Sequence, residues 1–216
     1  MAGRKPWECP RLWPGATIVI LAGGPSLGID DIAIVAAAHS LGLCKVIAIN
    51  STWRLFPTAD ILYAGDCAWW NANPDAQVWP GLKIGCSQVG AEPWPAAVNK
   101  INHQRNEGIE VDPRFVGAGT NSGQQALNVA VHLGGAKIPL LGYDFGAGPH
   151  GELHHHQDHP APLRNPDAPS FARWLRMMDT TAAPLATLWI DVVNCSRASA
   201  ITCFRRGDIH AELFGA

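Results

Sequence analysis

Short apolar runs recur along the chain and alternate with longer segments of mixed polarity. Runs without an apolar–polar alternation are typical of parallel strands that are buried on both faces. The predicted strands are Thr17–Leu21, Lys45–Asn50, Ile61–Ala64, Leu82–Cys86, Lys137–Leu141 and Leu188–Val193.

Three segments between these runs show the spacing of helices. They are Asp30–Leu41, Gln124–Leu133 and Ser170–Thr181. Asp30 and Asp31 lie in the first turn, where a helix dipole favours acids, and Gly134 follows the second helix as a stop signal. Strands that alternate with helices predict an α/β fold with a Rossmann-like, mostly parallel sheet and helices on both faces.

The chain contains no obvious linker, which predicts a single domain. We expect an irregular N-terminal arm over residues 1–15 and a nucleotide-binding α/β domain over residues 16–216. Residues 87–113 are rich in Pro, Asn and Gly and are interpreted as an insertion that covers the site. A polar, His-rich loop over residues 145–168 is long enough to predict a functional role.

Polar or Gly residues follow five of the predicted strands. In parallel α/β sheets, ligands bind at the carboxyl ends of the strands, so these residues are candidates for one site. They are Gly23–Ser26, Asn50–Ser51, Asp66, Asp144 and Asn194.

Two turns have the composition of phosphate-binding segments. Gly23-Gly24-Pro25-Ser26 follows the first strand, and Thr120-Asn121-Ser122-Gly123 precedes a helix. Glycines allow close approach of the backbone, and a helix N-terminus offers free N–H groups to an anion. Each turn also has a purely structural interpretation, as a tight strand-to-helix connection and as a helix N-cap.

Together the turns form a longer pattern with the strands around them. The stretches Ile18–Leu27, Val46–Asn50 and Asn121–Phe145, and the tail Asn194–Ile209, carry it. The pattern resembles the bacterial sialyltransferases of lipooligosaccharide synthesis and the related superfamily that contains the archaeal-type 6-hydroxymethylpterin diphosphokinase. Small proteins of tailed phages are similar to it as well.

The resemblance implies a set of nucleotide contacts. Carried over to this chain, they are Gly24, Pro25, Ser26, Asn50, Asn121, Ser122 and Gly123. Gly23 departs from the sialyltransferase pattern, which has Asn there, so the sugar donor is left open. Asp66 replaces another Asn, and its carboxylate suits a sugar hydroxyl or a divalent ion that bridges phosphates.

A cluster of histidines in the 145–168 loop allows three interpretations. In the transferase interpretation, His159 or His156 is the general base for an acceptor hydroxyl, with Asp158 as its orienting group. In the metal interpretation, His154, His156 and His159, with Asp66 as a further candidate, hold zinc or another transition metal. In the third interpretation the loop is merely solvated. Arg164 is the candidate phosphate clamp.

Composition narrows the function classes. The net charge of −2 argues against a nucleic-acid binder, and no apolar run is long enough to span a membrane. The N-terminus lacks the apolar core of a secretory signal, and six cysteines without a Cys-x-x-Cys pair predict reduced thiols in the cytoplasm. Nine Trp residues in an apolar chain are compatible with a homo-oligomer.

These observations favour a nucleotide-binding transferase, most simply a glycosyltransferase that inverts its sugar and uses a loop His as the base. One alternative is a Mg²⁺-dependent diphosphotransferase of the pterin kinase type, with Asp66 and Asp144 as metal ligands. The other alternative is a protein without enzymatic activity that binds and sequesters a nucleotide derivative.

Overall fold

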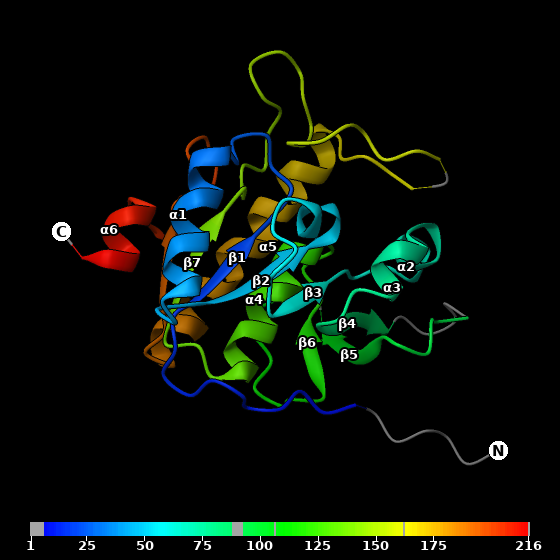
Figure 1. Cartoon of the computed structure of the whole chain (residues 1–216), viewed down its shortest axis with the longest axis horizontal. Coiled ribbons are helices and arrows are strands. Elements are labelled where there is room, and N and C mark those ends of the chain that lie inside the picture. Colours follow the sequence, from blue (N-terminus) through cyan, green and yellow to red (C-terminus); the bar gives the residue numbers. More distant parts are fainter. Residues whose placement is uncertain (1–6, 88–92, 106, 162, 216) are drawn as a thin grey trace.

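A single parallel β-sheet forms the centre of the molecule (Figure 1). The computed structural model describes residues 7–87, 93–105, 107–161 and 163–215. Within these residues nine strands pair, all in parallel, in the order β6-β5-β4-β3-β2-β1-β7-β8-β9. Their bounds are β1 Ile18–Leu21, β2 Lys45–Ile49, β3 Ile61–Tyr63, β4 Leu82–Ser87, β5 Asn99–Arg105, β6 Phe115–Gly117, β7 Lys137–Leu141, β8 Asp191–Asn194 and β9 Arg205–Arg206.

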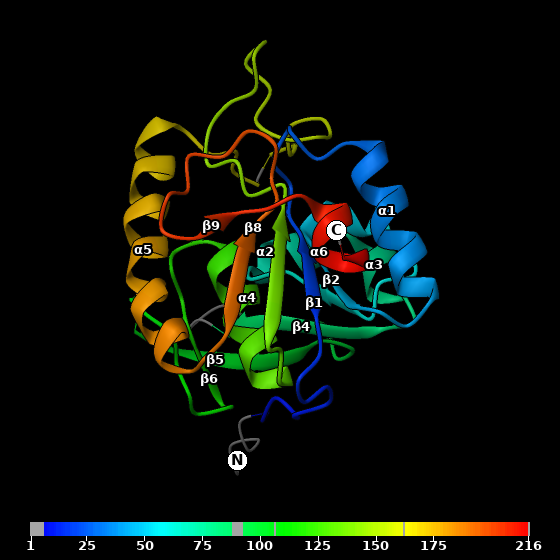
Figure 2. The same ribbon diagram turned by 90° about the vertical axis from the view of Figure 1, so that its left-hand side faces the viewer.

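Helices cover both faces of this sheet. Their bounds are α1 Ile29–Ser40, α2 Cys67–Ala72, α3 Pro74–Gln77, α4 Ser122–Leu133, α5 Ala168–Thr187 and α6 Ile209–Phe214, with a 3₁₀ helix η1 over Asn50–Arg54. Figure 2 shows the central strands between α5 on one side and α1 on the other. The predicted α/β fold with a parallel sheet and two covered faces is therefore confirmed.

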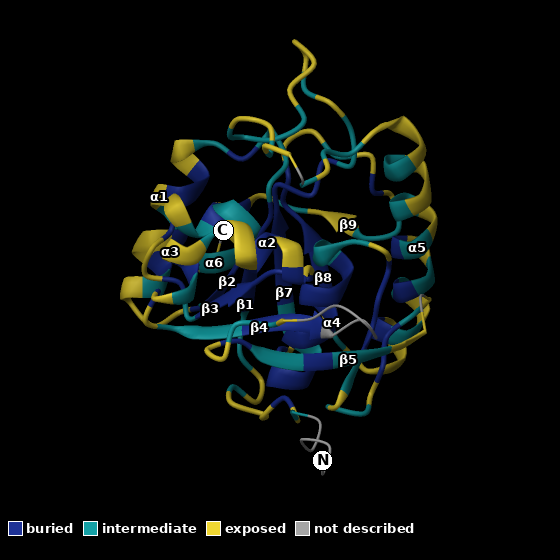
Figure 3. Ribbon diagram, turned by 90° about the vertical axis from the view of Figure 1, so that its right-hand side faces the viewer, coloured by how far each residue is buried: buried dark blue, intermediate teal, exposed yellow. Residues whose placement is uncertain are grey.

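Alternate residues of the central strands supply two separate cores. In β1, Ile18 and Ile20 pack with side chains of α4 and α5, whereas Val19 and Leu21 pack with side chains of α1 and α6. All four β1 residues are fully buried, and the central strands are uniformly buried in Figure 3, with exposed residues on the outer sides of the helices. Burial on both faces explains why these strands read as continuous apolar runs.

Strand β1 lies at the point where the direction of the chain through the sheet reverses. From β1 the chain proceeds through β2 toward β6 on one side, and it then returns through α4 to β7 on the other side of β1. Such a switch point leaves a crevice at the carboxyl ends of the two strands. Figure 2 shows the 145–161 loop beyond the end of β7.

Several predicted elements differ from the observed ones. Helix α5 continues past Pro184 to Thr187, because Thr181 and Leu185 are buried in the core and their packing outweighs the lost hydrogen bond. The last predicted strand begins three residues later, at Asp191, and Trp189 is an exposed turn residue.

The prediction that residues 87–113 form a cover over the site is wrong for residues 99–105. They form β5, which pairs with β4 and β6 inside the sheet. The pattern is hidden because β5 buries few of its side chains. Residues 88–92 and 106 of that segment lie outside the described residues.

The described part of the N-terminal arm, residues 7–15, contains no regular element and lies against the body of the protein. Cys9 is buried and donates its N–H to Pro113 O at 2.9 Å, and Trp13 N–H donates to Leu133 O at 2.8 Å. No disulfide joins any of the six cysteines, all of which lie in the described part of the chain. In the described part of the chain, every helix lacks the length or the apolar character that a transmembrane span requires.

Candidate functional site

Two neighbouring cavities lie along the carboxyl edge of the sheet. The smaller one, which we call the switch-point cavity, has a volume of about 120 Å³ and adjoins the ends of β1 and β7. The larger one, which we call the tryptophan cavity, has a volume of about 370 Å³ and adjoins the ends of β3 and β4. Asn50 and His159 line both cavities, so the two share part of their walls, and we refer to them together as the cleft.

Most of the predicted site residues line this cleft. The switch-point cavity includes Gly23, Gly24, Asn50, Asn121, Ser122, Gly123, Asp144, His154, His156 and His159 in its walls. The tryptophan cavity includes Asn50, Gly65, Asp66, Trp69, Trp94, His159 and Arg164. Asp158 lies in a shallower hollow beside them, with His156 and His159. The two predicted turns and the His-rich loop thus meet at one edge.

The first turn is bound to its own protein rather than left free for a ligand. Ser26 donates both its N–H and its hydroxyl to the Asp144 carboxylate, at 2.7 and 2.6 Å. Gly24 N–H donates to Gly142 O at 2.8 Å. Asp144 therefore takes the donors that the sequence assigned to a phosphate at Ser26, and Pro25 and Ser26 are not among the residues that line the two cavities.

The second turn leaves donors directed at the cleft. Asn121 caps α4 by accepting the Gln124 N–H at 2.9 Å, and Ser122 Oγ accepts the Gly65 N–H at 3.2 Å. Within the described residues no partner is found for the N–H groups of Ser122 and Gly123. These are the unpaired first-turn donors of a 12-residue helix, and they carry the positive end of its dipole.

Backbone strain is concentrated at the same edge. Asn50, Thr120 and Phe145 have positive φ values of 49°, 58° and 51°. Asn50 and Phe145 line the switch-point cavity, and Thr120 directly precedes its Asn121 wall. Such conformations are costly for residues other than Gly, and they persist where surrounding contacts hold them, often at binding sites.

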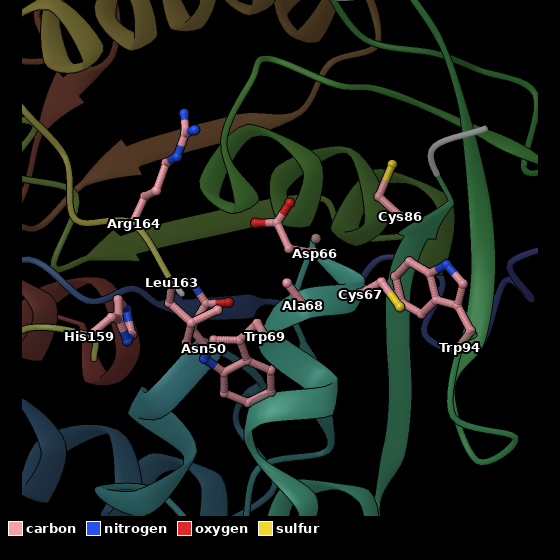
Figure 4. Close-up of a pocket in the computed structure, with 11 residues that line it drawn as sticks. Asn50, Asp66, Cys67, Ala68, Trp69, Cys86, Trp94, His159, Leu163 and Arg164 are labelled. Carbon is pink, nitrogen blue, oxygen red and sulfur yellow. The ribbon is translucent and has the colours of Figure 1, made fainter. Parts of the chain in front are cut away.

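The tryptophan cavity combines indole rings with charged groups at its rim (Figure 4). Trp69 is buried at the cavity wall, and its Nε1 donor has no partner among the described residues. Asp66 is open to the cavity, but the surrounding protein limits its hydration and raises its pKa. Figure 4 shows Arg164 extending from the 145–168 loop on the opposite side from α2. The cavity can thus accept a polar, partly aromatic ligand.

Trp69 and Trp70 have different environments despite being adjacent. Trp70 is fully buried and donates its Nε1–H to Ala64 O at 3.0 Å, so it belongs to the core. Trp69 packs edge to face against it and lines the cavity.

The two carboxylates predicted to hold Mg²⁺ are kept apart. Asp66 lines the tryptophan cavity, whereas Asp144 lines the switch-point cavity and is bound by Ser26. Burial is the largest effect on the Asp144 pKa and raises it, while the hydrogen bonds from Ser26 oppose that shift.

Three imidazoles of the loop converge on the switch-point cavity. One ring nitrogen from each of His154, His156 and His159 lies within 4.8 Å of the other two. Their ring centroids are 4.8 to 5.1 Å apart, and His154 and His156 stack nearly parallel. His155 turns the other way and contacts Thr52 Oγ1 at 3.0 Å through Nε2.

Burial lowers the pKa of three imidazoles of this loop, those of His154, His155 and His159. Desolvation is the main reason why the pKa of His159 and that of His155 are lowered to about 4, and repulsion from neighbouring imidazoles adds to it. The His154 pKa is lowered for the same two reasons. Neutral imidazoles can accept a proton or coordinate a metal.

Asn165, rather than Asp158, orients the cluster. Asn165 Oδ1 accepts the His159 N–H at 2.8 Å and contacts His154 Nε2 at 3.2 Å, and Asn165 Nδ2 donates to His159 O at 3.1 Å. Asp158 is exposed, and among the described residues no hydrogen bond joins it to either imidazole. The predicted orienting role of Asp158 is therefore not observed.

Asn194 also differs from its prediction. It is fully buried at the end of β8, where it holds Ser199 and the backbone around Ser196, so it supports the fold and does not reach the cleft. The pairing of Asn165 with the histidines was not predicted, and its only signal in the sequence was its proximity to the His cluster. A position of Trp69 in a cleft was one of two interpretations of the Trp69-Trp70 pair, since the pair directly follows a strand end.

Comparison with known proteins adds little to this geometry. No protein-family model matches the chain, and no curated protein matches it. A solved structure titled "Crystal structure of gox2253" is 13% identical, with a TM-score of 0.30. The match covers 83% of this chain and 50% of that chain, so this chain spans about half of its length. A likeness of this size carries no argument about function, and the resemblance described above rests on its motifs alone.

Proposed function

We propose that this protein binds a nucleotide or nucleotide sugar along the carboxyl edge of its sheet and transfers a group from it to an acceptor. The observation that carries the proposal is the position of the switch-point cavity. Residues from the ends of β1 and β7 and from the N-terminus of α4 line it together, at the place where α/β folds bind nucleotides.

In this proposal the phosphate lies at the N-terminus of α4. The unpaired N–H groups of Ser122 and Gly123 and the helix dipole favour an anion there. The first turn has a supporting role, because Asp144 already accepts its donors at Ser26. A phosphate close to the Asp144 carboxylate would be repelled, which also favours the α4 side of the cavity.

The rest of the ligand extends into the tryptophan cavity. Its volume of about 370 Å³ is in the range of small-molecule sites. Asp66 can accept hydrogen bonds from sugar hydroxyls, the buried Nε1 of Trp69 can donate one, and Arg164 at the rim can pair with a second phosphate. The shared residues Asn50 and His159 would contact the middle of such a ligand.

The transfer step needs a group that takes a proton from the acceptor. His159 borders both cavities, and its lowered pKa keeps it neutral at pH 7. A neutral imidazole at this position can accept the proton of an acceptor hydroxyl while the nucleotide leaves toward α4. The arrangement therefore suits direct transfer without a covalent intermediate.

The binding part is tested by substituting Ser122 with Asp. An acid at the first turn of α4 is favourable for the helix, and its carboxylate can still accept the Gly65 N–H, but it repels a phosphate. We expect nucleoside mono- and diphosphates and nucleotide sugars to raise the Tm of the wild type. Ser122→Asp should bind the same ligands at least about tenfold more weakly, a loss of about 1.4 kcal/mol.

Ser122→Asn is the matched control, since it has the same shape without the charge, and it should keep most of the affinity. The proposal fails if no nucleotide shifts the Tm of the wild type, or if Ser122→Asp responds like the wild type. Release of free nucleotide from the bound nucleotide sugars tests transfer. Binding without such release would leave a sequestering protein.

A further inference from the structure

The side-chain cluster of His154, His156 and His159 has a geometry that proton transfer alone does not require. A single general base needs one imidazole, yet three rings present nitrogen atoms within 4.8 Å of one another. The cluster also lies in the wall of a cavity rather than on an open surface. Three convergent imidazole nitrogens next to a cavity are typical of catalytic metal sites.

Hydrogen bonds reach one ring nitrogen of His154 and one of His156 from outside the cluster. Asn165 Oδ1 accepts from the His159 backbone N–H, so the amide oxygen is the atom that faces His154 Nε2. A proton of neutral His154 on Nε2 satisfies Asn165 Oδ1, while the Gly23 backbone is a second hydrogen-bond partner of this ring and opposes the lowering of its pKa. His156 Nδ1 lies 2.6 Å from Gln157 O, so its proton is on Nδ1 and its lone pair on Nε2.

The ring nitrogens on the far side from Asn165 and Gln157 O lie near the same place. A Cβ atom built on Gly23 would lie 3.5 Å from His154 Nδ1 and 3.9 Å from His156 Nε2. Both nitrogens therefore face the glycine turn, and Gly23 leaves room beside them.

We propose that His154, His156 and His159 bind one divalent transition-metal ion of the zinc class, with its remaining position open to the switch-point cavity. Zinc binds imidazole nitrogens at about 2.0–2.1 Å. Side-chain rotations that move each ring nitrogen by about an ångström would bring the three nitrogens to one ion. Metal-bound imidazoles are commonly oriented by a hydrogen bond to their second ring nitrogen. Asn165 and Gln157 O make hydrogen bonds of this kind to His154 and His156.

The donor set determines the chemistry of the open position. Within the part of the chain that the structure describes, no Asp, Glu or Cys joins the three histidines. The ion would therefore keep its full positive charge and favour water, hydroxide or an anionic group of a ligand. The inference goes beyond the proposed nucleotide function and does not rest on it. A metal-bound nitrogen of His159 cannot also act as the base, so the two roles exclude each other.

The test is a zinc titration of the full chain in the absence of nucleotide. The protein is first treated with a chelator, and Zn²⁺ binding is followed by calorimetry. Co²⁺ is added in parallel, because its visible absorption reports tetrahedral nitrogen ligation. We expect one ion per chain. His154→Ala, His156→Ala and His159→Ala should each lower the affinity by about 100-fold or more, and Asn165→Leu by about tenfold.

His150→Ala is the matched control, because His150 belongs to the same loop and is exposed and outside the cluster. It should bind Zn²⁺ like the wild type. Circular dichroism of each metal-free variant shows whether it is folded. An alanine variant that is not folded is replaced by the glutamine variant at the same position, such as His159→Gln. The inference is overturned if the wild type binds no ion, or if folded cluster variants bind it as tightly as His150→Ala does.

Nucleotide binding by the wild type is measured separately in the presence of a chelator, so that this result and the proposed function can fail independently. A wild type that binds nucleotide but no Zn²⁺ would refute the metal site and leave His159 as the base.

Discussion

The neighbouring glycines of the first turn have different surroundings. A Cβ at Gly24 would lie 2.4 Å from Gly142 O and 2.6 Å from Asp144 Oδ1, closer than real Cβ contacts allow. At Gly23 the nearest atoms, on imidazole rings, are at ordinary contact distance. Gly24 is therefore required by close packing between the ends of β1 and β7, whereas Gly23 leaves space for the loop.

This difference predicts opposite outcomes for the two alanine variants. Gly24→Ala should reduce the free energy of unfolding by about 1–3 kcal/mol, because backbone atoms of β7's end cannot move aside. Gly23→Ala should change it by less than about 0.5 kcal/mol. Urea denaturation of both variants measures the difference in the free energy of unfolding. Equal losses would show that the surroundings of Gly23 and Gly24 do not differ as the structure describes.

Helix α4 uses its buried polar side chains to hold the segment that leads to the second turn. Asn128 Oδ1 accepts the N–H groups of Glu110 and Gly117, each at 2.8 Å, and Asn128 Nδ2 donates to Glu110 O at 2.9 Å. Gln125 binds Tyr63 and Ala118 in the same way. These contacts fix residues 110–118, which position Asn121 at the start of the helix.

Replacing Asn128 with Leu should therefore be strongly destabilising. The substitution keeps the volume but leaves three buried backbone groups without partners, at about 1–3 kcal/mol each. We expect a loss of at least about 3 kcal/mol in the free energy of unfolding, measured by chemical denaturation. Val131→Ala removes apolar contact from a half-buried position of the same helix and should cost less than half as much. A smaller loss for Asn128→Leu than for Val131→Ala would contradict this role.

The elements that sequence could predict are those with a strong local pattern. Strands β2 and β7 are apolar runs buried on both faces, and their predicted bounds agree with the structure within one residue. Strand β5 was missed because only one of its residues is buried, which leaves no apolar run to detect. Strand β9 has two exposed residues, and its pairing with β8 depends on the fold rather than on its own sequence.

At the scale of the whole molecule, the position of the site was more predictable than its contacts. Ligand-binding residues of parallel sheets follow the strands, and this rule predicted that the two turns and Asp66 lie at one edge of the sheet. The pairing of Ser26 with Asp144 spans 118 residues and exists only because β7 lies beside β1. Likewise, no local pattern could show that the side chain facing His154 is that of Asn165 rather than that of Asp158.

Stability of the whole molecule should depend on pH through its buried histidines. Burial lowers the pKa of His155 and His159 to about 4, and it also lowers that of His132 and His154. An unfolded chain, with ordinary imidazoles near pKa 6.5, binds more protons than the folded chain between about pH 6.5 and 4. Folding is thus fully favoured by these groups above pH 6.5 and loses their contribution as the pH falls toward 4.

Other charged groups act differently in this range. The raised pKa values of Asp66 and Asp144 act in the opposite sense, because these carboxyls take up protons more readily when folded. The pKa of Glu212, lowered to about 2 by Arg205, affects stability only at lower pH. The large shifts of His155 and His159 dominate this balance, so a net fall in Tm is expected between pH 7 and pH 4.5.

His155 provides the sharpest test of this pH dependence, because it lies outside the proposed metal cluster and contacts Thr52. Asp158, Arg54 and the neighbouring imidazoles surround the same loop, and His155→Gln leaves all of them in place. The variant should show a fall in Tm between pH 7 and pH 4.5 that is smaller than that of the wild type by about 2–4 °C for each kcal/mol of linkage removed.

His210→Gln, which removes an exposed imidazole of α6, serves as the control, and its Tm should fall as much as that of the wild type. Both scans are made in chelator, so that metal release does not contribute. Identical falls for His155→Gln and the wild type would show that burial of this ring does not govern the acid sensitivity.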